Sequence, residues 1–202
     1  RDIFYTELVG LGHTRLSILD LSDLANQPMV CSKNRFVIVY NGEIYNHLEI
    51  KNELIEKGYR FKTSSDTETL LYSWIEWGAG AIRLLNGIFS FSIYDKKEDK
   101  LFLGRDYFGV KPLYIYKKEN TFAFSSEIKA LINIKNFDES LNYEAVINYL
   151  TFLWSPGKQT MYKYVNKLLP GRIIEIETNT LKYKNIEKDP RNVFRCNYWD
   201  LS

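Results

Sequence analysis

Cysteine and histidine are almost absent from this sequence. Its 202 residues include only Cys31, Cys196, His13 and His47, with neither a C-x-x-C nor an H-x-x-x-H spacing. A structural zinc site or a disulfide framework therefore has almost no ligands available. The scarcity of cysteine also favours a reducing compartment, so we expect a cytoplasmic location.

Long apolar runs and an excess of one charge are absent as well. The longest unbroken apolar stretch covers residues 36–40, far short of the roughly 20 residues of a membrane helix. Lys and Arg total 27 against 25 Asp and Glu, which gives a formal net charge of +2. This balance favours neither a nucleic acid nor a membrane surface as a partner.

Aromatic residues, by contrast, are abundant and make up 15% of the chain. They suit half-buried strands better than a helical bundle. Several predicted strands are joined by short polar connections, at residues 96–99, 118–120 and 178–180, so the sheets should be mainly antiparallel. The predicted strands cover residues 7–12, 35–40, 88–95, 100–104, 113–117, 121–125, 172–177 and 181–184.

Helices are predicted between the strands, and the three clearest cover residues 46–57, 66–77 and 143–152. Ser65 and Glu68 have the spacing of a capping box, and Asn142 is the expected cap of the last helix. Helices mixed with antiparallel hairpins, without a strict βαβ order, favour an α+β layered domain. We assign residues 1–182 to this domain and interpret the polar, irregular residues 183–202 as a linker.

No Ser-His-Asp or Cys-His pair is apparent from local spacing, so the candidate functional residues are polar side chains at strand ends and helix starts. The first is Arg15, which interrupts an apolar run and would be partly buried. A guanidinium offers a planar set of donors that pairs bidentately with a carboxylate. Arg15 is therefore either a ligand for a bound carboxylate or half of a structural salt bridge, for example with Asp20.

The second candidate is Asn41-Gly42-Glu43, directly after the strand predicted at residues 35–40. Asn-Gly is a strong hairpin signal. The residues after Glu43 lead into a helix instead, which would put Asn41 and Gly42 at a strand-to-helix corner. There, a side-chain amide and a backbone N–H could form an oxyanion hole for acyl transfer.

The third candidate is Asp66, in the first turn of the second predicted helix. The helix dipole already favours an acidic residue there, so a structural role would explain it. In the functional interpretation, Asp66 and Glu43 accept an ammonium group. With Arg15 for a carboxylate and the Asn-Gly pair for an oxyanion, these residues describe a site for an α-amino acid whose side-chain carbonyl is attacked.

Seven segments, in chain order, carry a family resemblance: LGHTRLSILD, VYNGEIYN, SSDTETLL, GIFSFSIYD, GRDYFGVKPLY, FSSEIKAL and LPG. From about Leu11 onwards, the chain resembles the glutaminase domain of glutamine-dependent asparagine synthetases. These are class II amidotransferases of the amino-terminal nucleophile type. NGEIYN, KPLY, SSEIKAL and the late Tyr198-Trp199 are closer to that branch than to the amidotransferases of purine or amino-sugar synthesis. The fold implied is a four-layer α/β/β/α sandwich of two mainly antiparallel sheets.

The resemblance implies a role for each candidate residue. Arg15 matches the ligand of the glutamine carboxylate. Asp66 and Glu43 match ligands of the glutamine amino group, and Asn41 and Gly42 match the oxyanion hole.

Four further residues receive an interpretation from the same resemblance. Leu16 and Ile18 would line the pocket wall, although core packing explains both at least as well. Arg105 and Asp106, in the Gly-Arg-Asp segment, are expected to be a structural pair beneath the site.

The resemblance also implies chemistry that these residues do not carry. The family's nucleophile is an amino-terminal cysteine activated by its own α-amine, and neither Cys31 nor Cys196 has that position. We therefore expect the nucleophile on a segment before Arg1, and no glutaminase activity from the 202 residues alone. No cofactor is expected in this chain, because ATP and Mg²⁺ belong to the synthetase domain that follows in the family.

The implied partners are glutamine and a carboxyl-terminal synthetase domain of the same polypeptide, and a homodimer is left open. The implied reaction releases ammonia from glutamine for the ATP-dependent amidation of aspartate. Two alternatives stay open: a catalytically inactive glutamine-binding or interaction module, and an amidotransferase domain that serves another acceptor.

Overall fold

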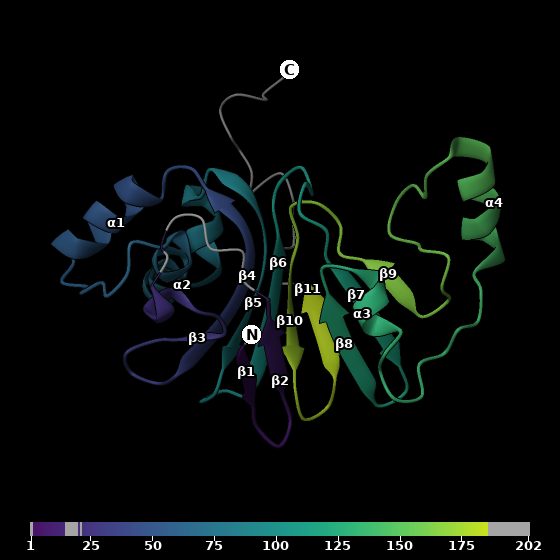
Figure 1. Cartoon of the computed structure of the whole chain (residues 1–202), viewed down its shortest axis with the longest axis horizontal. Coiled ribbons are helices and arrows are strands. Elements are labelled where there is room, and N and C mark those ends of the chain that lie inside the picture. Colours follow the sequence, from purple (N-terminus) through teal and green to yellow (C-terminus); the bar gives the residue numbers. More distant parts are fainter. Residues whose placement is uncertain (1, 15–19, 21, 186–202) are drawn as a thin grey trace.

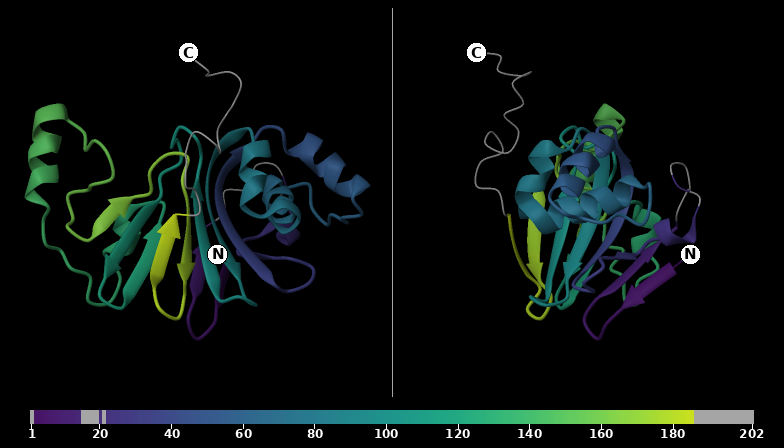
Figure 2. Two further views of the ribbon diagram at one scale, coloured as in Figure 1. Left: turned by 180° about the vertical axis from the view of Figure 1, so that it is seen from behind. Right: turned by 90° about the vertical axis from the view of Figure 1, so that its left-hand side faces the viewer.

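The computed structural model describes residues 2–14, 20 and 22–185, which form a layered α+β sandwich (Figures 1 and 2). The strands are β1 (Asp2–Tyr5), β2 (Gly10–His13), β3 (Met29–Val30), β4 (Phe36–Ile44), β5 (Gly87–Asp95), β6 (Lys100–Arg105), β7 (Tyr114–Lys118), β8 (Thr121–Ser125), β9 (Val165–Lys167), β10 (Ile173–Glu177) and β11 (Lys182–Asn185). The helices are α1 (His47–Glu56), α2 (Asp66–Trp77), α3 (Ile128–Leu131) and α4 (Tyr143–Phe152), with 3-10 turns η1 (Asp23–Ala25) and η2 (Gly78–Leu84).

A six-stranded sheet in the order β11-β10-β6-β5-β4-β3 forms the centre of the molecule, and every neighbouring pair in it is antiparallel. The three predicted hairpins are confirmed. β5 pairs with β6, β7 with β8 and β10 with β11, each across one of the short polar connections. Antiparallel neighbours need only such short turns.

Helices α1 and α2 cover one face of this sheet (Figure 1). Helix α2 begins at the predicted cap, where the Ser65 hydroxyl accepts a hydrogen bond from the N–H of Glu68 at 3.3 Å. It buries every residue from Asp66 to Trp74. Leu70, Leu71 and Trp74 pack with strand residues such as Phe91 in one apolar cluster, so the start of α2 is held firmly against the sheet.

The other face of the sheet packs on a second β layer, which consists of two pieces in the described part of the chain. One piece is the three-stranded sheet β8-β7-β9 and the other is the hairpin β1-β2. Val37, Val39 and Leu103 of the large sheet share a buried cluster with Leu11 and Leu113. The predicted sandwich of two antiparallel sheets is therefore confirmed, with one buried cluster between the β layers and a larger one beneath α1 and α2.

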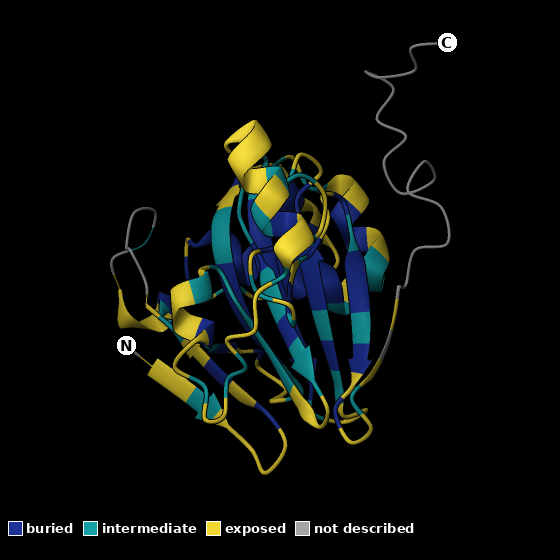
Figure 3. Cartoon of the chain, turned by 90° about the vertical axis from the view of Figure 1, so that its right-hand side faces the viewer, coloured by how far each residue is buried: buried dark blue, intermediate teal, exposed yellow. Residues whose placement is uncertain are grey.

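The outermost layer, α3 and α4, is thin. The buried cluster beneath it contains only Tyr116, Leu131 and Val165 in the described residues. Helix α4 begins at its predicted cap, where Asn142 accepts from the N–H of Ala145 at 3.3 Å, yet Ala145 is its one buried residue. Figure 3 shows this helix exposed along most of its surface. No helix in the described ranges has the length and apolar character of a membrane span.

Two predictions about the first half of the chain are wrong in detail. The strand expected at residues 7–12 is instead a hairpin of β1 and β2, because the Thr6 hydroxyl accepts hydrogen bonds from the N–H groups of Leu8 and Val9 and turns the chain. The strand-to-helix corner does not fall at Asn41-Gly42, since β4 continues to Ile44. At the other end, β11 runs to Asn185, and the linker role of residues 183–202 stays a prediction.

Candidate active site

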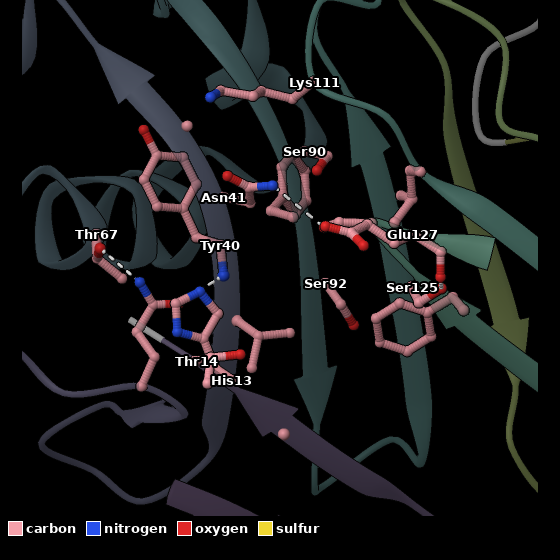
Figure 4. A pocket seen from close by; sticks show the side chains of 18 of the residues that line it. His13, Thr14, Tyr40, Asn41, Thr67, Ser90, Ser92, Lys111, Ser125 and Glu127 are labelled. Carbon is pink, nitrogen blue, oxygen red and sulfur yellow. Dashed lines mark hydrogen bonds between the residues drawn. The ribbon is translucent and has the colours of Figure 1, made fainter. Parts of the chain in front are cut away.

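A cleft of about 810 Å³ lies between β4 and β5 of the large sheet on one side and the end of β8 with the segment joining it to α3 on the other (Figure 4). One wall is formed by β4 and the start of α2, and the other by residues 124–127. The predicted residues on its lining are Asn41, Gly42, Glu43 and Asp66. The structure thus brings together four side chains or backbone groups from two segments that are far apart in the sequence.

Gly42 lies within β4, opposite Phe89 of β5. A Cβ atom at Gly42 would lie 2.6 Å from the Cα of Phe89, so only glycine allows the two backbones to approach this closely. This contact keeps β4 extended through the Asn-Gly pair, where a hairpin turn or a corner would otherwise be expected.

The N–H of Gly42 points away from β5. The Phe89 backbone opposite it bonds with Asp106, which accepts from the Phe89 N–H and donates its own N–H to the Phe89 carbonyl. Alternate residues of a strand direct their N–H groups to the same edge. Those of Tyr40 and Ile44 donate to Gln27 and Asp66, so the N–H of Gly42 lies on the same edge, between these two acceptors.

Asn41 extends its side chain across the cleft. Its Nδ2 donates a hydrogen bond to the Oγ of Ser126, 85 residues later in the chain, at 3.2 Å (Figure 4). An amide nitrogen carries two hydrogens, so a second N–H remains available in this arrangement. Asn41 can therefore offer a donor to the cleft beside the backbone N–H of Gly42.

Asp66 is buried at the first position of α2, with 6% of its surface exposed. Its Oδ2 accepts from the hydroxyl of Tyr40 at 2.7 Å and from the N–H of Ile44 at 3.1 Å. These contacts attach the helix start to β4 on both sides of the Asn-Gly pair. Glu43, by contrast, lines the cleft with an exposed side chain.

Arg105 and Asp106 support the floor of the site through the backbone. Asp106 accepts hydrogen bonds from four N–H groups, those of Phe89, Phe108, Val110 and Lys111. Arg105 donates to the carbonyls of Lys111, Leu168 and Gly109. Burial lowers the pKa of its guanidinium below the usual value, against the opposing charge of Asp106. Both residues are structural, but each bonds to backbone groups, some nearby in the chain and some distant, and they form no direct ion pair with each other.

Three predicted residues, Arg15, Leu16 and Ile18, lie outside the described residues. The residues just before them, His13 and Thr14, line the cleft. Cys31 is buried in the core beneath α1 and α2, and it is not on the cleft lining. The assignment of the nucleophile to a segment before Arg1 stays a prediction.

Several residues that build the cleft are not among the candidates predicted from the sequence. Tyr40, Thr67 and Ser126 lie inside the quoted segments VYNGEIYN, SSDTETLL and FSSEIKAL, so the motifs contained them without indicating a role. Gln27 has no signal of its own in the sequence. Its side chain donates to Thr67 at 3.2 Å and accepts from the Tyr40 N–H at 2.6 Å, contacts that only the fold creates.

Comparison with known proteins shows which sequences the chain resembles. The chain is 39% identical over 168 residues to asparagine synthetase (glutamine-hydrolysing) 1 of Bacillus subtilis, covering 83% of this chain and 26% of that protein. It is 34% identical over 201 residues to asparagine synthetase (glutamine-hydrolysing) 2 of the same organism, covering 96% of this chain and 25% of the relative. The chain therefore spans about a quarter of the length of these curated relatives.

The fold also has solved counterparts. The structure of the glutamine phosphoribosylpyrophosphate amidotransferase of B. subtilis, complexed with ADP and GMP, matches with a TM-score of 0.61 and 20% identity, over 89% of this chain and 35% of that one. At this identity the likeness concerns the fold alone. The family model described as "Glutamine amidotransferase domain" matches residues 1–187. With nearly the whole sequence matched in this way, the chain belongs to the glutamine amidotransferase domain family.

Proposed function

We propose that this domain hydrolyses the side-chain amide of glutamine and supplies the ammonia to a synthetase reaction within a longer polypeptide. The observation that carries the proposal is the convergence of Asn41, Gly42 and Asp66 on one cleft. Two hydrogen-bond donors and a buried carboxylate on one cleft suit an amino acid whose side-chain carbonyl becomes an oxyanion.

Substrate binding would use both charged groups on the α-carbon of glutamine, the ammonium and the carboxylate. The Oδ2 of Asp66 is already bonded to Tyr40 and Ile44, whereas its Oδ1 has no hydrogen bond among the residues that the structure describes. Oδ1 is therefore the proposed acceptor for the glutamine ammonium, with Glu43 at the cleft surface as a second. Arg15 is the proposed ligand of the carboxylate, because its guanidinium suits that group.

The reaction requires a nucleophile, for which we propose a cysteine at the amino terminus of the complete polypeptide. Its thiolate attacks the amide carbon, and a C–S bond forms. Asn41 and Gly42 stabilise the resulting oxyanion. The C–N bond then breaks, the departing nitrogen takes a proton from the cysteine's own ammonium, and ammonia leaves. Water hydrolyses the thioester, which yields glutamate and regenerates the thiol.

A groove beside the cleft offers a place for an additional strand that would carry the proposed cysteine. It has a volume of about 180 Å³ and lies between β2 and β8, each of which has a strand partner on one side in the described residues. Leu11 and Phe122 make its lining apolar, and Gly12 and Phe124 line both the groove and the cleft. A segment preceding Arg1 could pair here and present its first residue to the cleft.

The acceptor of the ammonia is proposed from the relatives. Both B. subtilis relatives are named asparagine synthetases, and the part of each beyond the match leaves room for a synthetase portion. We propose that this portion uses ATP and Mg²⁺ to activate aspartate and that the whole protein works in the cytoplasm. In the part of the chain that the structure describes, no group of three His, Cys, Asp or Glu side chains is arranged to hold a metal ion.

The test is Asn41→Ala in the full-length protein. Loss of one oxyanion donor should reduce glutamine-dependent turnover roughly a hundredfold to a thousandfold, which is about 3 to 4 kcal/mol of transition-state stabilisation. Synthesis from added ammonia should change little, because it bypasses amide hydrolysis. Asn133→Ala, at an exposed amide beside α3, is the matched control and should behave as wild type.

The outcomes separate the alternatives. Equal loss with both nitrogen sources would mean that Asn41 supports the fold. A wild-type glutaminase rate in Asn41→Ala would reject the oxyanion role. A full-length protein that binds glutamine without releasing glutamate would favour the inactive binding module.

A further inference from the structure

Tyr40 is held at both its backbone and its hydroxyl. The backbone N–H donates to Oε1 of Gln27 at 2.6 Å, and the hydroxyl donates to Oδ2 of Asp66 at 2.7 Å. Tyr40 and Asp66 are 4% and 6% exposed, so water competes little for this contact. A buried hydrogen bond to a carboxylate is among the stronger ones in proteins.

The contacts around Tyr40 form a link between β4 and the start of α2. Ile44 donates its N–H to the same Oδ2 of Asp66, and Gln27 connects the Tyr40 backbone to Thr67 (Figure 4). The proposed oxyanion donors, Asn41 and Gly42, lie on β4 between these attachment points. The link therefore fixes the position of the Asp66 carboxylate relative to the donors.

We propose that the hydroxyl of Tyr40 is a positioning group for Asp66, holding one carboxylate oxygen so that the other accepts the α-ammonium of the substrate. The proposal rests on the proposed function and deepens it, because it makes Tyr40 a determinant of selectivity for amino acids over their des-amino analogues. Tyr40 acts through Asp66 and touches no reacting atom.

The protonation of Tyr40 agrees with a permanent donor role. Burial, together with the neighbouring Asp66 carboxylate, raises the pKa of the Tyr40 hydroxyl well above its ordinary value. The hydroxyl consequently keeps its proton throughout the physiological range. Without it, Asp66 would keep only the Ile44 N–H as a donor to Oδ2 and could rotate away from the substrate.

The test uses Tyr40→Phe in the full-length protein, with glutaminase kinetics as the readout. The KM for glutamine should rise roughly tenfold, the effect of losing one hydrogen bond to a charged group. The kcat should change little, because the ammonium contact is the same in the ground state and the transition state. Glutaramate, which is glutamine without its α-amino group, should inhibit wild type and Tyr40→Phe equally.

Tyr94→Phe is the matched control. Tyr94 is equally buried on the neighbouring strand, and its hydroxyl donates to Asp99 at 2.8 Å, away from the cleft lining. This variant should keep the wild-type KM. Tyr40→Phe combined with Asp66→Asn should match Asp66→Asn alone, because Tyr40 acts only through that carboxylate.

Each contrary result has a distinct meaning. An unchanged KM for glutamine in Tyr40→Phe, an equal weakening of glutamine and glutaramate, or additive losses in the double variant would overturn the positioning role. A wild-type full-length protein that releases no glutamate from glutamine would overturn the proposed function itself.

Discussion

The two helical layers of this domain differ sharply in how they are packed. Helix α2 buries every residue from Asp66 to Trp74 against the large sheet, whereas α4 buries Ala145 alone. Helix α4 is nevertheless the more hydrophobic of the two on average. Apolar composition therefore does not decide which helix joins the core; the position of the helix over a sheet face does.

The same contrast extends to the cleft. One wall consists of β4 and the buried start of α2, joined by the hydrogen bonds of Tyr40 and Gln27. The other wall, at residues 124–127, is half-buried or exposed, and the bond from Asn41 to Ser126 connects it to β4. Three of the proposed substrate contacts, Asn41, Gly42 and Asp66, thus lie on the wall that packs on the larger core.

Leu71→Ala should produce the largest loss of stability. Leu71 is 1% exposed in the core beneath α2, and its truncation should lower the free energy of unfolding by about 2 to 5 kcal/mol. Urea unfolding of the 202-residue chain measures the loss. A decrease no larger than that of an exposed leucine would mean that the two helical layers do not differ in packing.

Gly42→Ala should come next and should affect both stability and activity. The new methyl group would press on the β5 backbone at Phe89, which we expect to cost about 1 to 3 kcal/mol of unfolding free energy. Glutaminase turnover of the full-length protein should fall as well, because the N–H of Gly42 would shift. Gly80→Ala is the control, since a Cβ there meets no atom within 4 Å. Equal stability of the two variants would contradict the close approach of β4 and β5.

An ion pair at the far end of β4 should make stability depend on pH. Burial opposes the ionisation of Asp95, but hydrogen bonds from Arg35 and from the N–H of Lys97, with the charge of Arg35, bring its pKa below the ordinary value. A carboxyl group whose pKa is lowered by folding stabilises the protein at pH values above its unfolded-state pKa of about 3.9. This stabilisation disappears as the pH falls through the folded-state pKa.

Asp95→Asn should therefore cost about 1 kcal/mol at pH 7, and its difference from wild type should shrink in acid below about pH 4. Asp138, whose pKa is lowered by hydrogen bonds from Lys118 and Ser140 in the thin layer, provides the comparison. Asp138→Asn should have a smaller effect, because the Asp138 side chain is more exposed than that of Asp95. Urea unfolding across pH 3 to 7 would test both variants, and a pH-independent loss in Asp95→Asn would reject the ion pair as its cause.

Leu150→Ala should have the smallest effect. Leu150 is 72% exposed on α4, so the same truncation that damages α2 should change the free energy of unfolding by no more than about 0.5 kcal/mol. Urea unfolding alongside Leu71→Ala gives a direct comparison of the two layers. A loss as large as that of Leu71→Ala would show that α4 is covered in solution.

Much of the fold could be predicted because it depends on local patterns. The capped starts of α2 and α4 and the three hairpins follow from residue types at fixed spacings, Ser65 and Asn142 among them. The hairpin of β1 and β2 could not be predicted in this way, because the turn at Thr6 depends on hydrogen bonds to the Thr6 side chain and not on a Gly, Pro or Asn turn signal.

For the candidate site, too, the residues could be predicted but their geometry could not. The residues Asn41, Gly42, Glu43 and Asp66 were selected from the sequence and lie on one cleft in the structure, although their catalytic and binding roles stay predictions. The geometry assigned to the Asn-Gly pair was wrong. A strand and a corner have similar local signals, and the contact with Phe89 that keeps β4 extended comes from a residue 47 positions later (89 − 42).

The sequence by itself determined the element types, the antiparallel hairpins and the chemical groups available for an amino-acid site, because each depends on neighbouring residues or on residue chemistry. Tertiary structure alone decided that Tyr40, Gln27 and Ser126 belong to that site and that α2 is buried while α4 is exposed. These features depend on which helix faces pack against a sheet and on contacts between residues 26 and 85 positions apart. Local sequence patterns do not predict such contacts.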